Sequence, residues 1–173
     1  MSFSIRTSIQ GFVKGKAKLC CSRRKWADCL GELHRRGHNR TESGAFLLGV
    51  RHSDYCVVVQ PAYYDDLEPD ALSTGAVVLG GRGYGALWRL CQEVGLSVIA
   101  DVHTHPGAPF QSEIDRTNPM IAVTGHVSLI VPDLARRYFG PRHLGIYEYS
   151  GSHRWRNWSG DHATDFVYVG FWG

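Results

Sequence analysis

The stretch that decides the fold of this chain is Asp101-Val-His-Thr-His-Pro-Gly-Ala-Pro-Phe-Gln-Ser-Glu-Ile-Asp115. Apolar and β-branched residues dominate 96–103, and this pattern predicts a buried strand. Pro106 cannot donate to a sheet ladder, so we expect the strand to end there. Because residues two apart on a strand point to the same face, His103 and His105 should project together from its C-terminal end.

Two further polar residues follow, and their spacing predicts the start of a helix. Ser112 and Asp115 are neighbours on one helix face, and Ser112 can cap that helix with Asp115 as its partner in a capping box. Together with His103 and His105, Asp115 completes a set of two imidazoles and one carboxylate. Such a set leaves one position for water on a tetrahedral zinc ion, as catalytic sites do, so the sequence predicts one zinc per chain.

This stretch resembles the JAMM motif of the JAB/MPN metalloprotease family, in which an upstream glutamate precedes His-x-His-Pro and Ser-x-x-Asp. The segment Arg40-Thr-Glu42-Ser-Gly-Ala-Phe-Leu-Leu-Gly49 is similar to the strand that opens the catalytic core of bacterial members. The resemblance covers roughly residues 20–150. Six residues separate His105 from Ser112, where family members commonly have one more, and the difference lies in a Gly/Pro loop that absorbs a deletion easily.

The resemblance assigns a role to each of these residues. It implies that His103, His105 and Asp115 hold zinc. It also implies that Glu42 is the general base and that Ser112 hydrogen-bonds the tetrahedral oxyanion. Hydrolysis needs such a base, because a group must take the proton of water and hand it to the leaving amine. The same donors could hold ferrous iron, as in some oxygenases, but that interpretation gives Glu42 and Ser112 no function.

Two other polar residues near the motif have open roles. Asp101 precedes His103 by two positions on the same strand face, so it either orients an imidazole or is a charge at the end of the strand. His126 stands before the apolar run 127–131. An ordinary histidine at the start of a strand is favoured there over one that approaches the site.

Strand and helix patterns are mixed in order along the chain, which predicts an α/β fold with a mixed sheet flanked by helices in a single domain. The resemblance implies JAB/MPN-like architecture, with the layering of cytidine deaminases. We expect a lead-in strand within 1–22, a catalytic core over 23–150, and one or two strands within 151–173 that pack on the core. Expected elements are helices at 23–36 and 84–94, a hairpin of 42–51 with 55–63, and strands at 127–131 and 145–150. The glycine-rich run 80–85 is expected to be a flexible turn.

Length and composition fit this picture. The chain has 173 residues, of which 43% are hydrophobic, enough for one domain with its own core. No apolar run approaches the length of a transmembrane helix, and residues 1–10 lack the apolar region of a signal peptide. Five cysteines without a C-x-x-C pair suit a reducing compartment. We therefore expect a cytoplasmic protein that does not bind a membrane.

The net charge of +3 hides an asymmetry, because residues 1–40 carry ten Lys/Arg and only two Asp/Glu. A basic segment can touch nucleic acid or an acidic partner, but a solvated helix face also explains the charges and is favoured. Aromatic residues are not interleaved with these charges, so a stacking platform for single strands is not indicated. We therefore expect no nucleic-acid partner, and the sequence leaves the oligomeric state open.

The resemblance also implies a substrate class, the amide bond after the C-terminus of a ubiquitin-like protein. The chain looks like the small bacterial members, some of which act in anti-phage conjugation systems. We expect a deubiquitinase-like isopeptidase or processing protease whose partners are a ubiquitin-like protein and its conjugates. An extended tail could lie along a sheet edge, and the irregular, acidic stretch 65–85 could contact the partner. Alternatives are a hydrolase of small peptides or sulfur-carrier proteins, a non-catalytic MPN scaffold, and a RadC-like DNA-associated protein.

Overall fold

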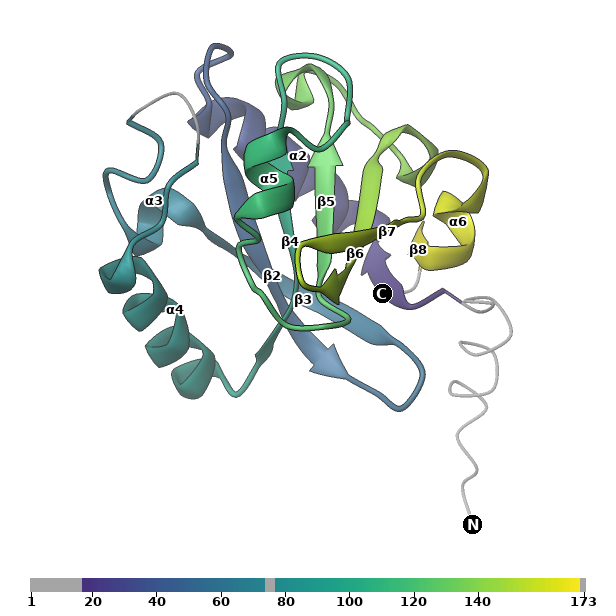
Figure 1. The fold of residues 1–173 in the computed structure, drawn as a ribbon, viewed down its shortest axis with the longest axis horizontal. Coiled ribbons are helices and arrows are strands. Elements are labelled where there is room, and N and C mark those ends of the chain that lie inside the picture. The colour runs from purple at the N-terminus through teal and green to yellow at the C-terminus, as the bar shows by residue number, and fades with distance from the viewer. Residues whose placement is uncertain (1–16, 74–76, 172–173) are drawn as a thin grey trace.

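In the computed structural model, residues 17–73 and 77–171 are described, and they form one mixed sheet with helices on both faces (Figure 1). The strand order is β7-β6-β5-β4-β2-β3-β1-β8. The expected single-domain α/β fold is therefore confirmed. The strands are β1 Leu19–Ser22, β2 Gly44–Arg51, β3 Cys56–Tyr63, β4 Ser97–Thr104, β5 Val127–Val131, β6 Gly145–Gly151, β7 Arg154–Asn157 and β8 Val167–Gly170.

Strand β4 lies in the interior of the sheet. It pairs with β2 in antiparallel and with β5 in parallel orientation. The antiparallel pairing brings Gly44, at the start of β2, opposite His103, near the end of β4. At the far end of the sheet, β1 pairs in parallel with both β3 and β8, so strands from the two ends of the described chain lie side by side.

The helices divide the core into two parts. Helix α2 covers one face of the sheet with Trp26, Cys29, Leu30 and Leu33, whereas α4 covers the other face with Leu87. Figure 1 shows α2 behind the sheet and the short helix α5 in front of it. The helices are α2 Arg23–Arg36, α3 Tyr64–Leu67, α4 Gly81–Val94, α5 Glu113–Thr117 and α6 Ala163–Phe166, with short 3₁₀ turns at Asp133–Ala135, Pro141–His143 and Gly160–His162.

Helix α4 begins at Gly81, three residues before the expected start, so the expected flexible turn over 80–85 was wrong. The Gly80 backbone N–H donates to the Glu68 carboxylate at 2.6 Å, just before the first helical turn. A carboxylate there is favourable because the helix dipole is positive at its N-terminus. Gly83 is buried against Leu79 and the same carboxylate. Both partners, Glu68 and Leu79, lie outside the run 80–85. Their contacts therefore hold this glycine-rich segment in a helix, although glycine has a low helix propensity.

No helix in the described part of the chain combines the length and the apolar character that a membrane crossing needs.

Candidate metal centre

The centre lies where β4 leaves the sheet. His103 belongs to β4 and is paired on both sides, with Gly44 and with Ile130. His105 follows the strand, but its backbone N–H still donates to the Val131 carbonyl at 2.9 Å. The extended backbone therefore continues past the end of β4, which places the two imidazoles on one face as the sequence predicted.

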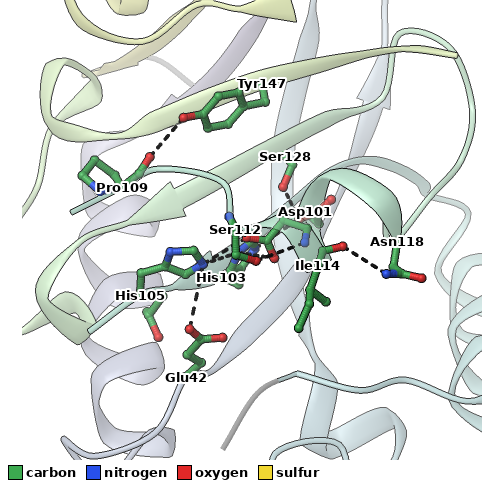
Figure 2. Close-up of polar contacts among 12 residues, drawn as sticks. Glu42, Asp101, His103, His105, Pro109, Ser112, Ile114, Asn118, Ser128 and Tyr147 are labelled. Carbon is green, nitrogen blue, oxygen red and sulfur yellow. Dashed lines mark hydrogen bonds and ion pairs between the residues drawn. The ribbon is translucent and has the colours of Figure 1, made fainter. Parts of the chain in front are cut away.

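The side chains of three residues, His103, His105 and Asp115, converge on one small space. Figure 2 shows the two imidazoles side by side next to Ser112. The Nε2 atoms of His103 and His105 are 3.1 Å apart. The carboxylate of Asp115 reaches both, with Oδ1 at 3.5 Å from His103 Nε2 and Oδ2 at 3.3 Å from His105 Nε2. One ligand atom from each residue lies within 4.8 Å of the others. Two imidazole nitrogens and a carboxylate oxygen in this arrangement could hold a metal ion.

The spacing of these atoms suits a tetrahedral ion. Zinc bonds of about 2.0–2.1 Å at tetrahedral angles place neighbouring ligand atoms about 3.3 Å apart. The two Nε2 atoms are 3.1 Å apart. One Asp115 oxygen lies 3.5 Å from His103 Nε2 and the other lies 3.3 Å from His105 Nε2, so each of these pairwise spacings is close to that value. The chemical types of the donors also fit zinc, because neutral imidazole and carboxylate are common zinc ligands.

Asp115 is held in place by the start of α5. The Ser112 hydroxyl accepts the Asp115 backbone N–H at 3.2 Å, and the Asp115 carboxylate accepts the Ser112 backbone N–H at 2.7 Å. This reciprocal pair is the capping box that the spacing predicted. The capping bond uses the Ser112 oxygen as an acceptor. Among residues 17–73 and 77–171, no recorded hydrogen bond uses its hydroxyl proton, so Ser112 can still donate toward the centre.

Glu42 stands apart from the three converging side chains. It lies just before β2, and its Oε1 is 3.9 Å from His105 Nε2 (Figure 2). Burial raises the pKa of this carboxyl above its ordinary value, an effect that nearby Asp115 reinforces and that His105 and His103 oppose. A carboxylate with a raised pKa beside a metal site is suited to accept and release a proton.

Burial and neighbouring charges act differently on the ligands themselves. Burial alone would raise the pKa of Asp115, but the imidazoles of His103 and His105 beside it bring it well below its usual range. Burial would lower the pKa of His103, yet Asp101 and Asp115 together raise it to about 10. The metal-free centre therefore pairs an ionised carboxylate with a protonated imidazole.

Asp101 is buried in the middle of the sheet, so it is not an exposed charge at the end of a strand. Only 1% of it is exposed, and its Oδ2 lies 3.8 Å from His103 Nδ1. Its other contacts come from β5 and its approach, where His126 Nε2 is 2.7 Å from Oδ1 and the Ser128 hydroxyl donates to Oδ2 at 2.9 Å. The sequence alone favoured an ordinary strand-entry histidine at His126 and gave no role to Ser128. A polar His-x-Ser pattern at the start of an apolar strand was the signal for both.

The loop between His105 and Ser112 is short but anchored. The His105 carbonyl accepts the Leu134 N–H at 2.8 Å, and the Gly107 carbonyl accepts the Asp133 N–H at 3.1 Å. These two hydrogen bonds hold the first half of the loop in place. The six residues 106–111 are therefore enough to bring Ser112 close to His103 and His105.

Two exposed apolar side chains come from the segments that carry Ser112 and Asp115. Phe110, in the loop, is 71% exposed, and Ile114, in α5, is 66% exposed.

The acidic stretch after β3 is largely engaged within the chain. The Arg36 guanidinium donates to Asp65 at 2.7 Å and to Asp66 at 2.8 Å. The third acidic residue, Glu68, accepts from the Gly80 N–H. Arg36 also pairs with Glu32, so this one cation compensates only part of the acidic charge.

Comparisons with known proteins find one partial sequence match and one solved structure with a similar fold, among others. No family model matches the sequence. A protein of Sinorhizobium fredii named "Probable metalloprotease y4jG" is 33% identical over 61 residues, which cover 35% of this chain and 38% of that protein. The chain thus matches well under half of its relative's length. The solution structure of protein DSY2949 from Desulfitobacterium hafniense superposes with a TM-score of 0.59 at 15% identity, over 87% of this chain and 92% of that one, which shows a shared fold.

Proposed function

We propose that this protein is a zinc-dependent metalloprotease of the JAB/MPN (JAMM) type. The observation that carries the proposal is the convergence of His103, His105 and Asp115 on one space, with Glu42 at its rim. The name of the partial relative, a probable metalloprotease, supports the same chemistry. The resemblance of the motif to JAMM proteins supports the finer assignment.

Each residue of the site would have its own role in amide hydrolysis. A zinc ion held by His103, His105 and Asp115 would polarise the substrate carbonyl and make a water molecule more acidic. Glu42 takes a proton from water and returns it to the leaving amine, as its raised pKa favours. The Ser112 hydroxyl donates to the carbonyl oxygen as negative charge develops there.

The substrate we propose is the amide bond after the C-terminal residue of a ubiquitin-like protein, either in a precursor or in a lysine-linked conjugate. Because β4 is flanked on both sides, an extended tail has to use another edge of the sheet. Strand β7 is such an edge, and the indole N–H of its Trp155 donates to the Arg116 carbonyl of α5 at 3.1 Å. A tail added to β7 would thus lie beside the helix that carries Asp115. A cytoplasmic bacterial conjugation system, such as one that acts against phage, is the setting we propose.

The test uses a panel of ubiquitin-like proteins, each fused through its C-terminal residue to a reporter. Wild type should carry one zinc per chain by elemental analysis and should cut the fusion at the junction. A chelator should abolish cleavage, and the Glu42→Gln variant should retain zinc without cutting. Intact fusions together with efficient turnover of unrelated short peptides would replace this proposal with a general peptidase.

A further inference from the structure

A charged side chain lies where a sheet of this kind normally holds apolar ones. Asp101 stands in β4 between β2 and β5, opposite Phe46 and Ser128, and is almost completely buried. A carboxylate in such a place is costly unless hydrogen bonds and opposite charge compensate it. Asp101 therefore needs partners.

Those partners come from the neighbouring strand. The parallel register places Ser128 beside Asp101, and His126, two residues earlier, falls on the same face. His126 Nε2 approaches Oδ1 at 2.7 Å, and the Ser128 hydroxyl donates to Oδ2 at 2.9 Å (Figure 2 shows the Ser128 contact). Both residues are buried, so neither bond competes with solvent. Burial alone would raise the pKa of Asp101, but the nearby imidazoles of His103 and His126 bring it below its ordinary value.

The fixed carboxylate faces the back of a ligand residue. Asp101 Oδ2 lies 3.8 Å from Nδ1 of His103, while Nε2 of the same ring points to His105 and Asp115. Within the described residues, Asp101 is the only recorded polar side-chain neighbour of that Nδ1 atom. Metal-binding histidines almost always direct their second nitrogen to a carboxylate or carbonyl, which fixes the tautomer and the ring orientation.

We infer that His126 and Ser128 are positioning residues for the metal centre and act on His103 through Asp101. The inference rests on the proposed function, because it requires that His103 binds a metal. His126 holds Oδ1 and Ser128 holds Oδ2, so the carboxylate cannot rotate away from Nδ1. When a metal displaces the Nε2 proton of His103, Asp101 favours the tautomer that keeps the other proton on Nδ1 and leaves the Nε2 lone pair for the metal.

A purely structural role makes a different prediction. In that case the Asp101–His126 bond only ties β4 to β5, and its loss lowers stability without changing the metal. A matched control separates the two roles. Val127 lies between His126 and Ser128 but faces the opposite core. Val127→Ala therefore destabilises the same strand by removing packing and leaves the Asp101 network intact.

The experiment measures zinc affinity by competition with a chromophoric chelator and the visible absorption of the cobalt-substituted protein. His126→Phe removes the donor at similar volume, and it should weaken zinc binding on the order of 10-fold and shift the cobalt bands. Asp101→Asn should weaken binding about 10–100-fold. His126→Gln, which can still donate to Oδ1, should restore affinity and spectrum toward wild type. Val127→Ala should lower the melting temperature alone.

Each outcome decides a separate point. If His126→Phe lowers the melting temperature as Val127→Ala does, with wild-type affinity and spectrum, the positioning role is wrong while the metalloprotease proposal stands. If wild type itself binds neither zinc nor cobalt, the metal centre is wrong and the positioning role falls with it. Weaker binding in His126→Phe that His126→Gln restores supports the positioning role whatever substrate the enzyme proves to use.

Discussion

Two carboxylates beside the same pair of imidazoles are tuned in opposite directions. Burial raises the pKa of Glu42, whereas bonds from both histidines lower that of Asp115. The difference follows from distance, because Asp115 lies at 3.3–3.5 Å from the ring nitrogens and Glu42 only approaches one of them at 3.9 Å. Opposite shifts in neighbouring groups commonly separate a permanent anion from a proton carrier. Asp115 is thus suited to bind a metal and Glu42 to move a proton.

This division predicts the behaviour of Glu42→Gln. The variant should keep its fold and its zinc, since Glu42 is not one of the three converging ligands. Its hydrolysis rate should fall by about 10²–10⁴-fold, the usual effect of removing a general base. Elemental analysis and steady-state kinetics on the same preparation check both parts. Wild-type rates in a fully loaded variant would show that another group is the base.

Ser112 has two functions that substitution can separate. Ser112→Ala removes both the cap of α5 and the hydroxyl donor, whereas Ser112→Gly removes the hydroxyl but retains most of the capping preference. If the hydroxyl stabilises the oxyanion, both variants should lose about 10²–10³-fold in kcat. Rate measurements and melting curves are compared for the pair. A loss in Ser112→Ala that Ser112→Gly largely avoids would assign the effect to the cap.

Zinc binding should depend on pH through His103. The pKa of this imidazole is raised to about 10 in the metal-free protein, so at neutral pH its proton must leave before zinc can bind. Apparent affinity should therefore rise as pH increases from about 6.5 and level off near 10, and binding should release protons. Titration calorimetry in buffers of different ionisation enthalpy measures that release. Affinity that stays constant from pH 6.5 to 9 would contradict the prediction.

At the scale of elements, local pattern was enough for the parts of the site that are close in sequence. Alternation placed His103 and His105 on one strand face, and the Ser112–Asp115 spacing gave the capping box. What sequence could not supply was pairing between distant segments. The bond of Asp101 to His126 depends on the β4–β5 register, and the contacts of Arg36 depend on where α3 meets α2. Both arise from tertiary packing, which periodicity does not encode.

The start of β2 offers a test of how tightly that packing holds the site. Gly44 lies directly opposite His103 in the β2–β4 pair. A Cβ at Gly44 would collide with the buried Tyr64 ring and lie 2.8 Å from the Val102 carbonyl oxygen. Gly44→Ala should therefore cost about 1–3 kcal/mol of stability and weaken metal binding. Gly31→Ala, in α2 with nothing within 4 Å of its new Cβ, should be neutral or slightly stabilising. Denaturant unfolding and zinc affinity of both variants check this contrast, and equal stabilities would refute it.

At the scale of the whole molecule, the centre joins a rigid part of the fold to a loosely held one. His103 belongs to an interior strand that is buried over nearly its whole length. Asp115 belongs to α5, which has five residues and buries none of them. Besides the capping box, α5 has the bond from Trp155 to the Arg116 carbonyl, and few other contacts connect it to the body. Local stability should therefore be low at α5 and high at β4.

A bound zinc ion should fix this helix to the sheet, because its ligands come from both sides. In hydrogen exchange, amides of 113–117 should exchange more slowly with zinc than with a chelator, while those amides of α2, on the opposite face, that exchange by local opening should not change. Free zinc at about 100 times its Kd should stabilise the fold by about 2.7 kcal/mol, which raises the melting temperature by roughly 5–10 °C. The His103→Ala variant is the control, since its exchange should not respond to zinc. Equal exchange of α5 with and without stoichiometric zinc in wild type would show that Asp115 does not anchor the helix through the metal.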